Sequence, residues 1–253
     1  MPNFGIIIST YGQFKYAEIA IRSALKYTPD AAVWLIDDGS PNWSQEWAER
    51  LTDTLPNLHV LRQSKNGGLT QTWNIGLTVC RGAGYEFACL ANSDVIFTEN
   101  WSNSVVDVLR QGKYSLVGPV TNAPGHCARQ NVRQHCDYRI GDDLETINGV
   151  SADLIARNQP PIKGKVNGYC MVAKTETWWK GAHQETQVFN PKHPMHKNED
   201  ELQGRWGKMN MYSAILPTSF VFHYRGVTRK ATHGPQGRGW FRGDLKQRIK
   251  ELS

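Results

Sequence analysis

Short apolar runs alternate with amphipathic stretches through the first half of this chain. The runs are rich in β-branched residues and end in small polar or acidic residues, which predicts buried strands over 4–10, 31–37, 58–62 and 85–90. Between them, apolar residues recur at helical spacing and predict helices over 14–27, 41–55 and 69–79. Repeated β-α-β alternation is typical of a doubly wound, mostly parallel sheet.

The periodicity is weaker in the second half. A helix over 101–110 and a strand over 115–119 are expected first. The stretch 121–165 is rich in Asn, Gln, Arg, His and Gly, and is interpreted as a long loop with one helix over 151–157. An apolar segment over 166–173, a helix over 199–206 and a strand over 213–223 follow. We expect one α/β domain.

Acidic residues follow two of the predicted strands. Asp37 and Asp38 end the second strand, and Asp94 follows the fourth. Ligands of open α/β sheets bind in the crevice beyond the carboxyl ends of the strands, so these three side chains are expected along one crevice. Such a crevice suits a sugar nucleotide and its metal ion.

Composition sets the broad class of protein. With 253 residues, 40% hydrophobic and 21% charged, the chain has the composition of a soluble globular protein, and no apolar stretch is long enough to span a bilayer. No secretory leader is visible before the first strand. The five cysteines are irregularly spaced, which favours reduced thiols and a cytoplasmic location.

The formal net charge is +6, and basic residues are concentrated near the C-terminus. They are Arg225, Arg229, Lys230, Arg238, Arg242, Lys246, Arg248 and Lys250. A solvated face is the usual explanation of such a run. Nucleic acid, an anionic membrane surface and the phosphates of a substrate are the alternatives.

Several short motifs occur in an order that resembles family 2 glycosyltransferases of the GT-A fold. They are Ser-Thr-Tyr at 9–11, Asp-Asp-Gly-Ser at 37–40, Asn-Gly-Gly at 66–68 with Trp-Asn-Ile-Gly at 73–76, Leu-Ala-Asn-Ser-Asp at 90–94, Asn-Gly-Tyr-Cys-Met-Val at 167–172, Glu-Asp-Glu-Leu at 199–202 with Arg205, and Val-Phe-His at 221–223. Each motif alone is weak, but the order and spacing together are specific. The resemblance covers about residues 4 to 227.

The resemblance implies a GT-A sheet with a smaller antiparallel region on the acceptor side. Residues 1–120 are then the nucleotide-sugar-binding half, 121–227 the acceptor-binding and catalytic half, and 228–253 a basic tail. It also implies a set of donor-binding residues: Thr10, Tyr11, Asp38, Asn74, Asn92, Ser93 and Gly168. Asp38 accepts well from an imide N–H or a ribose hydroxyl, which favours a UDP- or dTDP-sugar.

A divalent metal, Mn²⁺ or Mg²⁺, is implied at Asp94 with His223 as a second ligand. A carboxylate-held cation neutralises the charge that builds up on a nucleoside diphosphate leaving group. Many relatives have Asp where this chain has Asn92, and the neutral amide is expected to weaken metal binding.

Asp200 is the expected general base, and Glu199 is expected to orient it or the acceptor. In an inverting transfer one carboxylate takes the proton of the attacking hydroxyl. The predicted acceptor is a hydroxyl of a glycan, a lipid-linked molecule or a protein. The 121–165 loop is expected to shape its pocket and exclude water.

Three alternatives remain open at the level of sequence. The same chemistry on hydroxymethylated DNA bases would use the basic tail to bind nucleic acid. A non-catalytic protein that binds sugar nucleotides or glycans would explain Asn92. The His-Cys doublets at 126–127 and 135–136 also allow a zinc site, although structural zinc sites usually have closer cysteine spacing.

Overall fold

The computed structural model describes residues 3–138, 141–225 and 244–253. The strands are β1 (Phe4–Thr10), β2 (Ala32–Asp37), β3 (Leu58–Arg62), β4 (Phe87–Asn92), β5 (Val95–Phe97), β6 (Leu116–Val120), β7 (Ile162–Lys163), β8 (Cys170–Lys174) and β9 (Ser213–His223). The α-helices are α1 (Phe14–Tyr27), α2 (Gln45–Thr54), α3 (Leu69–Gly82), α4 (Asn103–Arg110), α5 (Leu144–Arg157), α6 (Thr175–Lys180), α7 (Asn198–Lys208) and α9 (Leu245–Leu252). Two 3₁₀ turns, η1 (Ala128–Gln130) and η2 (Val132–Gln134), interrupt the loop after β6.

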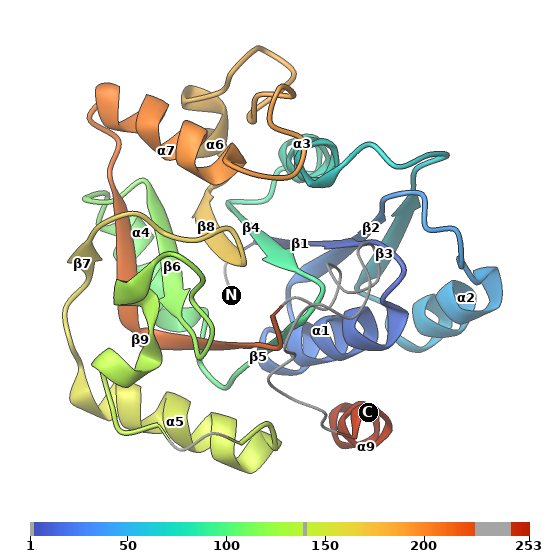
Figure 1. The fold of residues 1–253 in the computed structure, drawn as a ribbon. Helices are drawn as coiled ribbons and strands as arrows, with labels where there is room; N and C mark the ends of the chain where they lie inside the picture. The colour runs from blue at the N-terminus through green and yellow to red at the C-terminus, as the bar shows by residue number, and fades with distance from the viewer. Residues whose placement is uncertain (1–2, 139–140, 226–243) are drawn as a thin grey trace.

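The strands form one mixed sheet in the order β3-β2-β1-β4-β8-β6-β9-β5, with β7 beside β9 (Figure 1). The first four strands in this order are parallel, as are β6 and β9. β8 runs antiparallel to both β4 and β6, and β5 and β7 run antiparallel to β9. This arrangement confirms the predicted single α/β domain, with a mostly parallel half and a smaller antiparallel region.

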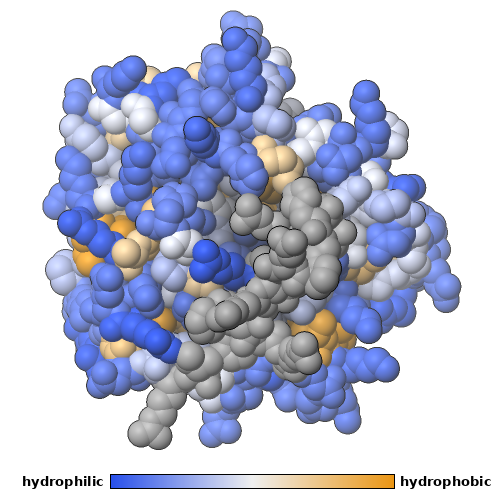
Figure 2. Space-filling model, viewed as in Figure 1, coloured by the Kyte–Doolittle hydropathy of each residue, from blue (hydrophilic) through white to orange (hydrophobic). Residues whose placement is uncertain are grey.

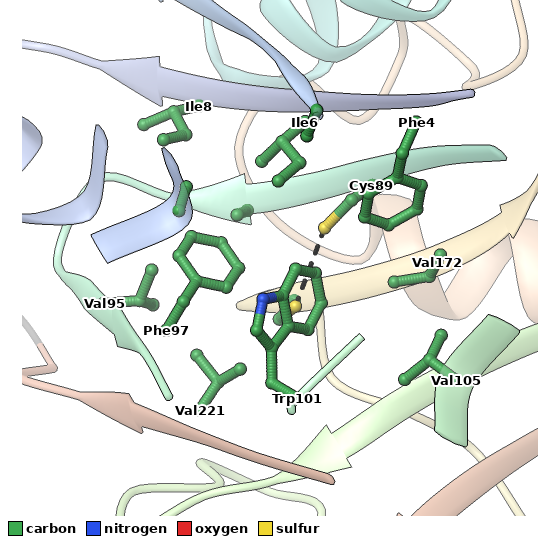
Figure 3. Close-up of a cluster of buried hydrophobic side chains, with 14 of the residues drawn as sticks. Phe4, Ile6, Ile8, Cys89, Val95, Phe97, Trp101, Val105, Val172 and Val221 are labelled. Carbon is green, nitrogen blue, oxygen red and sulfur yellow. Dashed lines mark hydrogen bonds between the residues drawn. The ribbon is translucent and has the colours of Figure 1, made fainter. Parts of the chain in front are cut away.

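The sheet has a hydrophobic core on each face because strand side chains alternate in direction. Ile6 and Ile8 of β1 pack in one core with Ala20 of α1, and Ile7 packs in the other with Trp73 of α3. Figure 3 shows the first core, in which β-strand residues surround Trp101. In Figure 1, α1 and α9 lie on one side of the sheet, and α3, α6 and α7 on the other.

Most predicted elements are confirmed, and the differences have local causes. The helix expected over 41–55 begins only at Gln45, because the Ser44 side chain accepts a hydrogen bond from the Trp47 N–H and caps it. The 121–165 loop contains a longer helix than expected. Asp143 caps α5 by accepting from the Thr146 N–H at 2.7 Å, and Asn158 ends it in the left-handed conformation.

The end of the basic tail forms a helix, α9, which the sequence pattern did not predict. α9 packs against α1 (Figure 1). Arg248 is 6% exposed and pairs with Glu251 on its own helix. Lys246 and Lys250 are exposed. The other predicted basic residues of the tail, Arg229, Lys230, Arg238 and Arg242, lie outside the described residues.

The five cysteines are free thiols, as predicted. Cys89 and Cys170 are neighbours on paired strands with their sulfurs 3.7 Å apart (Figure 3), and both are fully buried. Burial without a charged partner raises the pKa of Cys80 to about 12, so this thiol stays protonated. A cytoplasmic location stays a prediction.

The described surface is mostly polar. On the face in Figure 2, the hydrophobic residues form small separate areas among hydrophilic ones. Every helix within the described ranges is too short or too polar to cross a bilayer.

Glu18 of α1 makes the main buried ionic contact between α1 and α2. Its side chain is 4% exposed, and it accepts from Arg22 at 3.0 Å, from the Trp47 indole N–H at 3.0 Å and from Arg50 at 3.1 Å. Glu18→Ala is expected to lower the free energy of unfolding by about 3 kcal/mol, because it leaves Arg22 buried without its partner.

Urea denaturation of the variant measures this loss. Glu49→Ala is the matched control, since Glu49 is exposed and its carboxylate accepts from the exposed Gln45 side chain at 3.0 Å. Its expected change is within about 0.5 kcal/mol. Equal losses in the two variants would contradict the assigned role of Glu18.

Candidate active site

The carboxyl ends of β2, β1 and β4 bring the predicted donor-binding residues to one edge of the sheet. In the strand register, Thr10 of β1 lies opposite Asp37 of β2, and Ser9 lies opposite Asn92 of β4. Neighbouring strands are about 4.8 Å apart, so the ends of β2 and β4 are separated by roughly 10 Å with β1 between them. The edge is therefore wide enough to hold a nucleotide across three strands.

Asp38 is held by the loop that leads into α3. Its carboxylate accepts from the N–H groups of Gly67 at 2.7 Å and Gly68 at 3.0 Å and from the Gln63 amide at 2.8 Å. Burial raises the pKa of Asp38, and the two backbone hydrogen bonds oppose that rise. The loop therefore keeps a partly desolvated carboxylate in a fixed orientation at the strand end.

Asp37 has a different environment from its neighbour. It is fully buried, accepts hydrogen bonds from the backbone N–H and the hydroxyl of Ser40, and lies 3.5 Å from the Arg62 guanidinium. These contacts close the turn after β2. Asp37 therefore stabilises the turn after β2, and Asp38 is the carboxylate at the edge of the candidate site.

Thr10 and Tyr11 border Asp38 on the β1 side. The Thr10 carbonyl accepts from the Asp38 N–H at 2.9 Å. The Thr10 hydroxyl and that of neighbouring Ser9 are buried and have no hydrogen-bond partner among the described residues. A buried hydroxyl without a partner is costly, so these groups are suited to meet a bound ligand or water. Tyr11 is half-buried beside them.

Asp94 and His223 meet at the end of β4. The carboxylate oxygen Oδ1 of Asp94 lies 3.2 Å from Nε2 of His223, and both side chains are less than 10% exposed. Ser93, 3% exposed, precedes Asp94 in the turn between β4 and β5. The Asn92 amide nitrogen is 3.5 Å from the same His223 nitrogen. Residues 92–94 and 223 thus lie together, and their role in binding donor and metal stays a prediction.

The donor atoms of this pair fit a divalent cation. Nδ1 of His223 lies 3.3 Å from the Ala123 carbonyl oxygen, which only accepts, so the proton of a neutral ring is assigned to Nδ1. In that tautomer Nε2, 3.2 Å from Oδ1 of Asp94, has a lone pair available to a cation that the carboxylate also binds. Within the described residues, no third His, Cys, Asp or Glu joins them, so remaining ligands would come from the diphosphate and water.

The 121–123 segment holds His223 in place, a role that the sequence did not reveal. The Asn122 side chain accepts from the His223 N–H at 2.8 Å and donates to its carbonyl at 3.0 Å. The Tyr169 ring stacks on the imidazole, with centroids 5.3 Å apart and planes at 17°. Polar loop residues gave no periodic signal for these contacts.

Gly168 lies against the start of α7. A Cβ atom at this position would be 2.9 Å from the Trp73 ring and 3.5 Å from the Glu199 carboxyl group. Glycine is thus required for the backbone to pass between these side chains. The predicted contact of Gly168 with a donor sugar stays a prediction, and the structure adds this packing reason for the residue.

Asp200 lies one residue further along α7 and faces the 121–165 loop. Its carboxylate is 3.0 Å from the Lys165 ammonium and 3.8 Å from Nε2 of His126. The side chain is 37% exposed, so an acceptor hydroxyl can reach it. Asp200 and Glu199 therefore lie on the side of the site formed by the second half of the chain.

Asn74 has a structural role that differs from the predicted donor contact. Its amide donates to the Phe189 carbonyl at 3.1 Å, and its oxygen accepts from the Phe189 N–H at 2.9 Å. The residue is 8% exposed. This paired contact fastens the chain before α7 to α3, and it uses both polar atoms of the amide.

The His-Cys doublets do not form a zinc site. Both ring nitrogens of His135 are engaged, one with the Gln159 amide oxygen at 3.1 Å and one with the Arg129 carbonyl at 2.9 Å. His126 instead contacts Asp200. No cluster of three metal-ligating side chains occurs in the part of the chain that the structure describes.

The pKa of Cys127 depends on burial and in part on the carboxylates of α7. Burial raises its pKa to about 11, with further contributions from the charges of Asp200 and Glu199. At pH 8 about 0.1% of such a thiol is ionised, against about a quarter for an ordinary thiol of pKa near 8.5. From the ionised fractions alone, alkylation of Cys127 by iodoacetamide is expected to be about two hundredfold slower than that of a free cysteine peptide.

The pH dependence of this reaction gives the test. Cys127 is the half-exposed thiol, and the other four are buried. Its alkylation rate, followed by mass spectrometry, is expected to rise about tenfold per pH unit up to pH near 11. Asp200→Asn removes one charge and is expected to move the profile to lower pH. A profile centred near the ordinary thiol pKa would contradict the proximity of these groups.

The first comparison concerns protein families. A model described as glycosyl transferase family 2 matches residues 5–176, more than half of the chain. The match includes the Asp38 loop, the Asp94 turn and β8, and it ends before α7.

Curated proteins with similar sequences are described as glycosyltransferases. Glycosyltransferase GlyG of Streptococcus pneumoniae is 30% identical over 113 residues, which are 44% of this chain and 36% of that protein. The uncharacterized glycosyltransferase EpsJ of Bacillus subtilis is 34% identical over 83 residues, 32% of this chain and 24% of that protein. The chain thus matches about a third or less of the length of these relatives.

Solved structures share the fold at low sequence identity. Mannosyltransferase PcManGT from Pyrobaculum calidifontis, in complex with GDP-Man and Mn²⁺, has a TM-score of 0.62 at 14% identity, covering 88% of this chain and 56% of that one. GalNAc-T7 with UDP, GalNAc and Mn²⁺ has a TM-score of 0.63 at 16% identity, covering 88% and 44%. S. aureus TarS 1–349 has a TM-score of 0.57 at 15% identity, covering 88% and 60%.

Proposed function

The chain belongs to glycosyl transferase family 2, and we propose that it transfers a sugar from a nucleoside diphosphate sugar to a hydroxyl acceptor. The observation that carries this proposal is the buried Asp94–His223 pair, 3.2 Å apart, on the sheet edge that also presents Asp38. In this proposal residues 1–120 bind the donor, and residues 121–227 bind the acceptor and supply the base.

The donor nucleoside would lie across the ends of β2 and β1. Asp38 accepts from an imide N–H, while the buried Thr10 hydroxyl and the Tyr11 ring line the same side. This acceptor chemistry favours UDP- or dTDP-sugars. TarS has been solved in complex with UDP, whereas PcManGT is bound to GDP-Man, so related folds hold different nucleotides.

A divalent cation, Mn²⁺ or Mg²⁺, would be held by Asp94 and His223. When bound, it would neutralise charge on the diphosphate leaving group. The two structures similar in fold that contain Mn²⁺ support this choice of metal. Asn92 lies beside His223 and adds no negative charge to the metal site. Arg225, two residues after His223, would add positive charge near the diphosphate.

Asp200 would act as general base in an inverting transfer. It would take the proton of the acceptor hydroxyl as the oxygen attacks the anomeric carbon from the side opposite the leaving group. Lys165, 3.0 Å from this carboxylate, pairs with it and orients it. Glu199, which lies beside the Gly168 backbone, would orient the acceptor.

Donor turnover tests the proposal. The full chain is incubated with UDP- and dTDP-sugars in Mn²⁺, in Mg²⁺ and in EDTA, and release of nucleoside diphosphate is measured with and without a panel of saccharide acceptors. We expect metal-dependent release that an acceptor accelerates. Binding of the donor without any release would instead support the non-catalytic hypothesis.

The nucleic-acid hypothesis receives less support from the described residues. The last helix of the basic tail is packed on α1, and Arg248 is buried, so this part is not a solvated polycation. DNA-dependent stimulation of donor turnover that decreased with salt would restore the hypothesis.

A further inference from the structure

Thr70 joins the two halves of the candidate site through its backbone and its hydroxyl. It lies in the first turn of α3 and is 2% exposed. Its N–H donates to the Pro194 carbonyl at 3.0 Å, and its hydroxyl donates to the His193 carbonyl. The same hydroxyl accepts from the Asn198 amide at 3.1 Å. The Thr70 side chain therefore contacts both His193, in the segment before α7, and Asn198, the first residue of α7.

On the donor side, Thr70 is two residues from the loop that holds Asp38. The N–H groups of Gly67 and Gly68 donate to the Asp38 carboxylate at 2.7 and 3.0 Å. A shift of this carboxylate toward a bound nucleoside must therefore move, or be resisted by, the residues directly before Thr70.

On the acceptor side, the contact reaches the predicted catalytic pair. Asn198 is the first residue of α7, and its side-chain oxygen accepts from the Glu199 N–H at 2.9 Å. The two polar ends of one amide thus connect Thr70 with the backbone of Glu199, and Asp200 follows directly. The hydrogen bond between Asn198 and Thr70 therefore fixes the position of the first turn of α7.

The two segments are packed too closely to move independently. Gly68 has φ +87°, and a Cβ atom there would be 2.8 Å from the Pro194 carbonyl oxygen. The Leu69 N–H is 3.4 Å from the Met195 sulfur. Figure 1 shows the chain before α7 passing beside the start of α3. Consecutive residues 68, 69 and 70 are thus in contact with consecutive residues of the opposite segment.

We propose that Thr70 is a positioning residue that couples binding of a nucleoside at the Asp38 edge of the sheet to the placement of Glu199 and Asp200. The inference rests on the proposed function for its catalytic consequence, but the coupling itself is a property of the contacts. The hydroxyl is the essential group because it bonds to both His193 and Asn198. Thr70→Val keeps the branched shape and removes both bonds, whereas Thr70→Ser keeps the hydroxyl.

The first test needs no ligand. Amide hydrogen exchange, measured by mass spectrometry, follows peptides over 63–69 and 195–202 in the wild type and the variants. Thr70→Val is expected to raise exchange at least about fivefold in both peptides, with Thr70→Ser close to wild type. Thr78→Val is the matched control, since among the described residues the Thr78 hydroxyl bonds only to the Asn74 carbonyl of its own helix. Faster exchange in one peptide alone, or in neither, would overturn the coupling.

The second test measures catalysis. Thr70→Val is expected to lower kcat at least about tenfold with the donor KM within about twofold, because misplacing a catalytic group slows the reaction more than it weakens binding. Thr70→Ser is expected to restore most of kcat. Equal kcat in Thr70→Val and wild type would overturn the positioning role. Absence of turnover in the wild type would instead reject the proposed function, while the exchange experiment still decides the coupling.

Discussion

Asp94→Asn is expected to lower kcat/KM by about a hundredfold or more, and to raise the Mn²⁺ concentration needed for half-maximal activity. The substitution leaves an amide oxygen in place but removes the only charge that the 92–94 turn directs at His223. Since Asn92 is already neutral, loss of the Asp94 charge leaves no carboxylate in this turn to attract the cation. The measurement is the initial rate of nucleoside diphosphate release as a function of Mn²⁺ concentration.

His223→Gln and Asp137→Asn complete this experiment. Gln keeps a neutral donor atom, so a smaller loss of activity is expected, again with a higher Mn²⁺ requirement. Asp137 is exposed and does not belong to the proposed metal site, so Asp137→Asn is the control for the chemical change itself. High Mn²⁺ is expected to restore part of the activity of Asp94→Asn. If Asp94→Asn and wild type responded alike to Mn²⁺, the metal would have to be bound elsewhere or not used at all.

The position of the edge proposed to bind the donor was predictable because its residues follow a simple rule of sheet geometry. Thr10, Asp38 and Asp94 each follow an apolar run, and parallel strands present their carboxyl ends at one edge. The same rule did not separate Asp37 from Asp38. That distinction depends on Ser40 and Arg62 on one side and on the Gly67–Gly68 amides on the other, which become neighbours only when the chain folds.

The acceptor side was less predictable because its contacts join irregular segments. Asn122 and Ala123 hold His223 across about a hundred residues of sequence, and neither lies in a periodic stretch. The contact of Asn74 with Phe189 is not predictable, because a polar residue in a helix looks the same in sequence whether it binds a ligand or a backbone. α5 was expected too short because its first half has few apolar residues, and its start depends on the cap at Asp143.

The resemblance to a family supplied roles that geometry alone does not assign. Asp200 is exposed and ion-paired with Lys165, which is also the usual state of a surface carboxylate. It follows Glu199, whose carboxyl group is near Gly168, at the start of the helix that Thr70 and Asn198 anchor, and this position distinguishes it from other exposed acids.

Asp200→Asn is expected to lower kcat by about 10²–10⁴-fold while the donor affinity stays nearly constant. An amide cannot take the proton of the acceptor hydroxyl, and Asp200 belongs to α7, whereas the residues proposed to hold the nucleoside follow β1 and β2. The measurement combines single-turnover transfer rates with donor affinity from calorimetry. Release of diphosphate by slow donor hydrolysis is expected to fall less than transfer, because water does not depend on the same positioning.

Asp153→Asn is the matched control for this substitution. Asp153 is an exposed carboxylate, ion-paired with Arg157 at 2.9 Å as Asp200 is with Lys165 at 3.0 Å, so both variants lose a comparable surface pair. Wild-type activity is expected for Asp153→Asn. Glu199→Gln distinguishes the two acids of α7: it is expected to raise the acceptor KM more than it lowers kcat. If Glu199→Gln abolished transfer and Asp200→Asn did not, the base would be Glu199. Asp200 would then only pair with Lys165 and His126.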